Sequence, residues 1–310
     1  MSEVAQDKNR VRFGFFALGF ALFTVGWFIA AALGTKYGIW SWQFGLGTMY
    51  FAWGPIIAIL SILLSVAALI VGLIWSPRTR TVMLALGALF VSGLIAGRLF
   101  GMAATAAGLP PIHQASTDWA DQVPFSENLL EKRFVDQCDT SGDQAVDPAE
   151  EARCGINAVE DNPTLSLSTE DQARWPGFHG RLVADIQTSN EMDPALRGED
   201  RDQKPYPPLN TLVTDMDQTQ VFDIALEMVR ERGWNIAGAN HGKGRIEGWA
   251  FTPWFGFRDD FALRVLANEA GQTEVDMRSI SRVGISDLGA NSQRVYGFLA
   301  ELEREIEAAS

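Results

Sequence analysis

Three long apolar runs in the first third of the chain constrain the fold more than any other feature of the sequence. They lie at residues 13–33, 47–75 and 82–105. The hydrocarbon core of a bilayer is about 30 Å thick, and a helix needs roughly 20 apolar residues to cross it. The first run also exceeds the roughly 7–15 apolar residues of a typical cleaved signal peptide. The sequence therefore predicts three transmembrane helices, the first of which is retained.

The charge distribution divides the chain near residue 108. Residues 1–108 contain seven basic residues but only two acidic ones, Glu3 and Asp7. Of the 25 basic and 38 acidic residues in the whole chain, 18 and 36 therefore lie beyond residue 108, which gives that region a net charge of −18. Such a charge disfavours nucleic-acid binding, which depends on neutralising phosphates. We predict a membrane domain at 1–108, an acidic insertion and linker at 109–209, and a folded domain at 210–310.

Basic residues in the short loops indicate the orientation, because cytoplasmic loops are enriched in Lys and Arg. The loop between the first two runs contains one basic residue, Lys36. Three basic residues precede the first run, Lys8, Arg10 and Arg12, and two lie between the second and third runs, Arg78 and Arg80. The amino terminus is thus expected in the cytoplasm and residues 109–310 outside it. In a Gram-negative bacterium this places the helices in the inner membrane and the acidic region in the periplasm.

A stripe of small residues runs along the third apolar run at Gly93, Gly97 and Gly101. Small residues four apart allow two helix backbones to approach closely in a membrane. Two interpretations are open: packing within the three-helix unit, or docking onto another integral membrane protein. Arg98 comes late in the same run, and its side chain is expected to reach the outer interface.

Two cysteines, Cys138 and Cys154, bracket an acidic loop. An oxidising compartment favours a disulfide between them. The spacing of oxygen-bearing residues inside the loop matches a twelve-residue calcium loop, although Gln144 stands at the sixth position, where glycine normally allows the sharp turn. The six candidate ligands are Asp139, Ser141, Asp143, the Ala145 carbonyl, Asp147 and Glu150. Calcium binding and a disulfide-stapled acidic loop without metal both remain open, and no other cofactor is predicted.

The last hundred residues show clear helical and strand periodicities. Helices are predicted after Asp217, ending at Gly233, and after Asp287. Strands are predicted at 234–239, 245–252, 261–267 and 274–283, whereas residues 156–208 read mainly as connecting material. The order indicates an α+β domain, with an antiparallel sheet of four strands, or five, covered by two helices.

Alternation along these strands assigns a different chemistry to each sheet face. The apolar face, which is expected to contact the helices, carries Ile246, Phe261, Leu263, Val265, Val275 and Met277. The opposite face is predicted to carry Arg245, Glu247, Trp249, Arg264, Asp276, Arg278 and Arg282. These residues could form cross-strand ion pairs. Alternatively, their arginines could bind an anion, such as a lipid headgroup or a partner's carboxylates.

Four segments resemble the family called domain of unknown function 1499 (DUF1499). They are "PPIHQASTD" (110–118), "YPPL" (206–209), "RIEGWAFTPWFGFRDD" (245–260) and "VDMRSISRVGISDLGAN" (275–291). The resemblance covers residues 110–128 and 205–305, together with the membrane helices that some bacterial members carry, and it leaves 129–204 as an insertion. Because the activity of the family is not established, the resemblance implies a fold and a location but no reaction.

The motifs favour a membrane protein without catalytic activity. The sequence contains no GxSxG, HExxH or phosphate-loop motif, and nothing marks a cleft for acid–base work by Asp259, Asp260 or Asp276. We expect an accessory or assembly subunit of a membrane complex. The alternative is a protein that binds a lipid or small ligand at the membrane surface, and a hydrolase is a third and weaker hypothesis.

Overall fold

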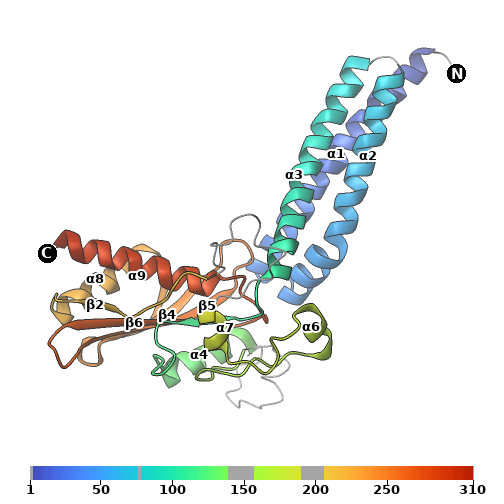
Figure 1. Cartoon of the computed structure of the whole chain (residues 1–310). Helices are drawn as coiled ribbons and strands as arrows, with labels where there is room; N and C mark the ends of the chain where they lie inside the picture. Colours follow the sequence, from blue (N-terminus) through green and yellow to red (C-terminus); the bar gives the residue numbers. More distant parts are fainter. Residues whose placement is uncertain (1–2, 76–77, 139–156, 190–205, 310) are drawn as a thin grey trace. The chain divides into compact units, whose positions relative to one another are not determined.

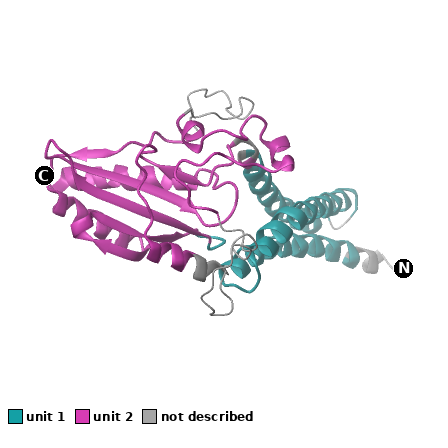
Figure 2. Cartoon of the chain, turned by 90° about the horizontal axis from the view of Figure 1, so that it is seen from below, with its two compact units in different colours: residues 1–104, 253–256 teal, residues 105–252, 257–310 magenta. Residues whose placement is uncertain are grey.

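The computed structural model describes residues 3–75, 78–138, 157–189 and 206–309 and divides the chain into two compact units (Figure 2). We call residues 1–104 with 253–256 the membrane unit, and residues 105–252 with 257–310 the sheet unit. The described parts of the predicted insertion at 109–209 therefore share one compact unit with the domain at 210–310.

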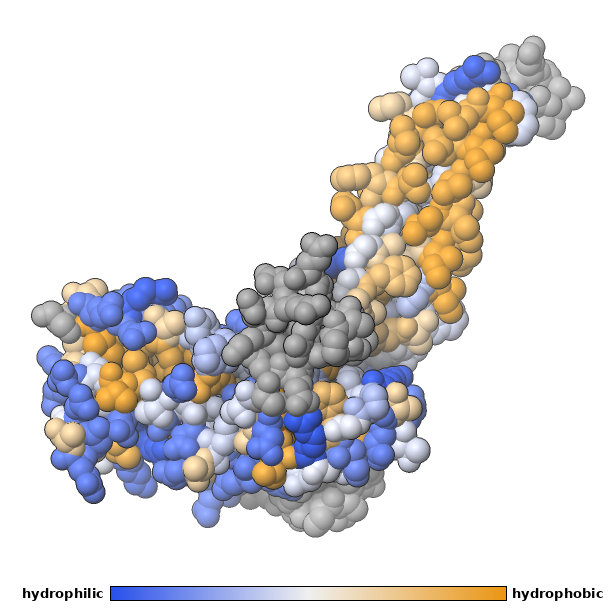
Figure 3. Space-filling model, in the orientation of Figure 1, coloured by the Kyte–Doolittle hydropathy of each residue, from blue (hydrophilic) through white to orange (hydrophobic). Residues whose placement is uncertain are grey.

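The membrane unit contains three long helices, labelled in Figure 1: α1 (Glu3–Lys36), α2 (Gly54–Ile74) and α3 (Arg78–Gly108). A π-helical segment, η1 (Gln43–Trp53), leads directly into α2. All three candidate spans are long and apolar enough to cross a membrane, which confirms the number of spans predicted from the sequence. Apolar side chains dominate their visible surface in Figure 3, as expected for helices surrounded by lipid.

Small residues form the interface among these helices. The buried cluster consists of Ala17, Ala21, Ala68, Ala85 and Ala88. Beside it, the hydroxyl oxygens of Ser61 and Ser92 lie 2.7 Å apart, and Ser92 also donates to the carbonyl oxygen of Ala88 at 2.8 Å. Such contacts allow close packing and satisfy hydroxyl groups where water is absent.

The sheet unit is built on one antiparallel sheet in which the strands follow the order β1-β6-β5-β4-β3, with β2 also paired to β6. The long strands are β3 (Asn235–Asn240), β4 (Arg245–Phe251), β5 (Arg258–Ala267) and β6 (Thr273–Ser281). They confirm the four predicted strands. Two three-residue strands, β1 (Gln114–Ser116) and β2 (Leu212–Thr214), extend the sheet beyond the predicted number.

Helices α8 (Gln218–Glu231) and α9 (Ala290–Ala309) cover the apolar face of the sheet, as the alternation predicted (Figure 1). Their buried Phe222, Phe298 and Leu302 pack with Phe261 and Met277 of the sheet. The predicted cap of α8 is confirmed, because Asp217 accepts from the backbone N–H of Thr219. Gly233 follows this helix with a φ of +66°, a conformation that glycine adopts without a steric penalty.

The opposite face of the sheet is also covered. Helices α4 (Glu127–Cys138), α6 (Thr169–Arg174) and α7 (Val183–Ser189) belong to the segments on this side (Figure 1). Phe125 and Leu129 pack there against Ala262 and Ile280. A second cluster joins Ile112, Leu165, Leu167, Val183, Ile186 and Tyr206. Much of 156–208 is thus not mere connecting material, because its scattered apolar residues form a small core that local periodicity does not reveal.

Candidate functional site

The register of the strands places the predicted charged residues on one face. Arg245 lies opposite Arg264, which in turn lies opposite Asp276, while Glu247 and Arg278 both face Ala262. Directly opposed residues point to the same side of a sheet. This face is covered, however: Arg278 and Arg282 are both 0% exposed. We use the name charged sheet face for the charged residues on this side of the sheet, together with the groups that they bind. These residues are Arg245, Glu247, Arg264, Asp276, Arg278 and Arg282.

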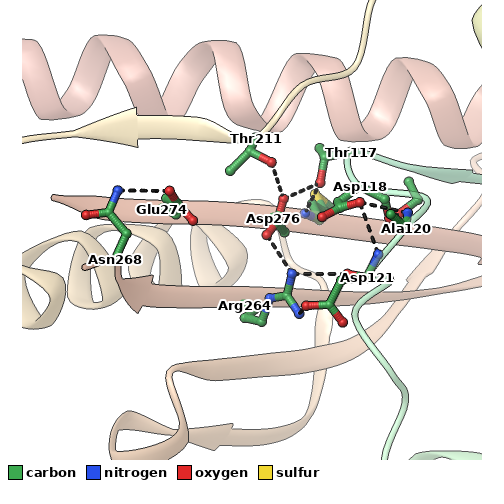
Figure 4. Close-up of polar contacts among 11 residues, drawn as sticks. Thr117, Asp118, Ala120, Asp121, Thr211, Arg264, Asn268, Glu274 and Asp276 are labelled. Carbon is green, nitrogen blue, oxygen red and sulfur yellow. Dashed lines mark hydrogen bonds and ion pairs between the residues drawn. The ribbon is translucent and has the colours of Figure 1, made fainter. Parts of the chain in front are cut away.

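Asp276 is the centre of the first cluster on this face (Figure 4). One carboxylate oxygen accepts from the hydroxyls of Thr211 at 2.6 Å and Thr117 at 2.9 Å. The other accepts from Arg264 at 2.9 Å, and Arg264 also donates to the carboxylate of Asp121 at 2.7 Å. Both oxygens of Asp276 are therefore engaged, and this cluster connects β6 and β5 with the segments before α4 and β2.

Glu247 anchors the start of α4. Its carboxylate accepts from the backbone N–H of Ser126 at 3.0 Å and also from the Ser126 hydroxyl. The Nε atom of Arg245 lies 3.3 Å from the same carboxylate. A side chain that sequence alternation assigned to a potential ligand surface thus holds a neighbouring segment of its own chain.

Arg278 binds β1 and the segment before α6. It donates to the side chain of Gln114 at 3.0 Å, the carbonyl of Glu160 at 2.7 Å and the carboxylate of Asp161 at 3.0 Å. Its guanidinium also lies 5.3 Å from the centre of the Phe125 ring. Burial lowers the pKa of Arg278, and Asp161 opposes this effect.

A deeply buried ion pair joins Asp260 with Arg282. Arg282 binds the carboxylate with two nitrogens, at 2.9 Å through Nε and 2.7 Å through Nη2. Arg133 of α4 approaches from the covering side, with its Nε 3.1 Å from the same carboxylate. Burial raises the pKa of Asp260, whereas both arginines oppose that shift. Sequence reasoning missed Arg133, because no local pattern links α4 to β5.

Asp259 points to the other face of β5, as the alternation requires. It accepts from Arg294 of α9 at 2.5 Å, and Arg294 also donates to Ser279 at 3.0 Å and Asn291 at 2.6 Å. Asp259 and Asp260 are therefore neighbours in sequence but bind different arginines on opposite sides of the sheet.

A polar turn before α9 completes the network. Asp287 accepts from the backbone N–H groups of Gly289 at 2.7 Å and Asn291 at 3.1 Å, and Asn291 donates to the carbonyl of His113 at 3.0 Å. Removal from water raises the pKa of Asp287 to about 6, although these hydrogen bonds oppose the shift and the residue keeps partial exposure. Burial and the charge of Arg133 lower the pKa of His113 to about 4.

The arrangement neutralises its charges internally. Each carboxylate described above is bound by a cation or by hydrogen-bond donors of the same chain, which is how buried charges are normally tolerated. Within the described ranges no group of three or more His, Cys, Asp or Glu residues could hold a metal ion. The predicted calcium ligands, 139–150, lie outside those ranges, as does Cys154, so both predictions for this loop stand as made.

The glycine stripe lies on the outside of the membrane unit. An added Cβ at Gly93, Gly97 or Gly101 would meet no described atom within 4 Å. The buried side of α3 carries Ser92, Ala96 and Leu99 instead. The described part of the unit thus leaves the stripe uncovered.

Comparison with known families supports the resemblance noted in the sequence. The family model described as "Protein of unknown function (DUF1499)" matches residues 157–302. This part of the chain is a DUF1499 domain. The match contains β2 to β6, with Asp260, Arg282 and Asp287, but neither α4 nor β1. Residues 157–204, which the sequence pattern assigns to an insertion, fall inside the span of the DUF1499 match. No curated protein and no solved structure matches the chain.

Proposed function

We propose that this DUF1499 protein is a non-enzymatic accessory or assembly subunit of a membrane complex, with its sheet unit outside the cytoplasm. The observation that carries the proposal is the uncovered stripe on α3. Glycines at 93, 97 and 101 lie on one side of a candidate span, and a Cβ added at any of them would have no described atom within 4 Å. In a membrane such a surface allows the backbone of a second helix to approach closely.

The charged sheet face also supports the membrane helices as the partner surface, because its charged groups are already bound within the chain. Its arginines bind carboxylates and carbonyls of their own chain, and Arg278 and Arg282 have no exposed surface. A ligand would have to displace the covering segments before it could contact these two side chains. The face is therefore better suited to holding the sheet unit together, which leaves the membrane helices as the favoured partner surface.

Purification from the native membrane tests the proposal. The full-length protein is extracted in mild detergent and analysed by native mass spectrometry, together with Gly97→Leu and the matched control Gly19→Leu. Gly19 also has open space around it but lies on α1, outside the stripe. We expect a stoichiometric partner with the unaltered protein and with Gly19→Leu, and loss of that partner with Gly97→Leu. Absence of any partner, or its retention by Gly97→Leu, would contradict the proposal.

The proposed orientation has its own test. A reporter phosphatase that requires disulfide bonds should be active when it is fused after Ser310, because an extracytoplasmic compartment is oxidising. The same reporter fused between α2 and α3 should be inactive, since the basic residues Arg78 and Arg80 at the start of α3 favour the cytoplasm. The reverse pattern would show that the orientation is wrong.

A further inference from the structure

The membrane unit contains a cavity of about 450 Å³, a size within the usual range of small-ligand pockets. All of its lining residues belong to this unit: they come from α1, η1, α3 and the four residues 253–256 between β4 and β5. Phe28, Ile29, Leu94 and Met102 are representative of the lining, which is apolar except for Tyr50 and Arg98. The cavity is only partly enclosed, so it is accessible from the surroundings of the helices.

Residues 253–256 are held against the helices of the same unit. Lys36 donates to the carbonyl of Pro253 at 2.8 Å. The ring of Phe255 lies edge-on to that of Tyr50, with 5.9 Å between ring centres. Trp254 lines the cavity beside Phe255 and is 64% exposed. An exposed tryptophan suits the boundary between acyl chains and water, where its ring and N–H group are both accommodated.

Arg98 is the one charged group in the lining. Tyr50 already donates its hydroxyl to the sulfur of Met102 at 3.1 Å, whereas Arg98 makes no hydrogen bond or ion pair with another described residue. Arg98 follows Arg78 by twenty residues, and a helix rises 1.5 Å per residue, so the two lie about 30 Å apart along α3. That distance equals the thickness of the hydrocarbon core. If Arg78 marks one interface, Arg98 reaches the headgroups of the other.

We propose that the cavity binds one acyl chain of an anionic phospholipid and that Arg98 binds its phosphate. Arginine is well matched to a phosphate group, because its planar fork presents several donors. Within the membrane unit a headgroup amine would find no carboxylate at this level, since the only acidic residues among 1–108 are Glu3 and Asp7, at the far end of α1, and residues 253–256 contain none. This chemistry favours phosphatidylglycerol over phosphatidylethanolamine. The inference is independent of the proposed partner helix.

Lipid titration of the full-length protein, monitored by native mass spectrometry, tests this site. The delipidated protein in detergent is titrated with phosphatidylglycerol or phosphatidylethanolamine that carry identical acyl chains. Arg98 can bind the phosphate of either lipid but repels the ammonium group of phosphatidylethanolamine, so we expect one tightly bound phosphatidylglycerol, preferred about tenfold. Arg98→Gln should abolish the preference. Leu94→Trp should reduce binding of both lipids, because the indole ring of the introduced tryptophan would occupy the cavity.

Arg80→Gln is the matched control, since Arg80 lies near the start of α3 and does not line the cavity. Arg98 is exposed, so its replacement leaves the helix packing unchanged. Equal binding of the two lipids by the unaltered protein would overturn the proposal. So would an unchanged preference in Arg98→Gln, an equal loss in Arg80→Gln, or a protein subunit that occupies the cavity in place of lipid.

Discussion

Asp260→Asn should destabilise the sheet unit more than any comparable exchange at an exposed ion pair. The change leaves Arg282, which is 0% exposed, and Arg133, which is 4% exposed, without their shared counter-ion. Removal of one partner from a buried ion pair typically costs about 3–5 kcal/mol in the free energy of unfolding. For a unit of about two hundred residues, each kcal/mol lowers the melting temperature by roughly 2–4 °C, which predicts a decrease of roughly 6–20 °C.

The assay is thermal unfolding of the full-length protein in detergent, followed by near-ultraviolet circular dichroism. Trp249 lies 5.5 Å from the guanidinium of Arg282 and should report the change locally. Asp121→Asn is the matched control, because its carboxylate binds Arg264 but is 76% exposed, and such pairs contribute about 1 kcal/mol or less. A decrease for Asp260→Asn no larger than that for Asp121→Asn would refute the argument that the buried pair stabilises the fold.

Three further predictions concern the sheet unit. His113 has a pKa of about 4 in the folded protein and about 6.5 in the unfolded chain. Protonation of the unfolded chain should therefore lower the free energy of unfolding by about 2 kcal/mol between pH 7 and pH 5. In parallel denaturant titrations, His113→Gln should remove this loss. An equal or steeper loss in the variant would contradict the assignment. For Asp287 the sign is reversed: its raised pKa makes the ionised form unfavourable in the fold, so stability falls as the pH rises from about 4 to 6. The free energy of unfolding of Asp287→Asn, minus that of the unaltered protein, should therefore increase by about 2 kcal/mol between pH 4.5 and pH 7. A difference that does not change with pH would argue against the raised pKa of Asp287. Gly248→Ala would place a Cβ 1.8 Å from the carbonyl oxygen of Asn235 and should lower the free energy of unfolding by about 1–3 kcal/mol. Gly297→Ala, in open space on α9, should instead raise it by about 0.5–1 kcal/mol. Similar melting temperatures for the two variants would contradict the steric argument.

Local sequence patterns determined a large part of this architecture. The apolar runs required membrane helices because lipid provides no partners for exposed backbone groups. Alternation assigned Phe261 and Asp276 to opposite faces of the sheet, and Asp217 and Gly233 marked the ends of α8. These features depend on residues close together in the chain, so their physical causes can be read directly from the sequence.

Contacts between distant residues were decided only by the tertiary structure. Nothing in the sequence around Arg133 indicates that it approaches Asp260, or that Ser126 binds Glu247. The charges of the sheet face were visible as a pattern, but whether they met water, a ligand or their own chain depended on which segment covered them. The same holds for the glycine stripe, because its spacing indicates a close-packing surface while only the arrangement of α1 to α3 leaves that surface uncovered. Periodicity specifies the side of an element on which a residue lies, whereas the long-range fold selects what that side contacts.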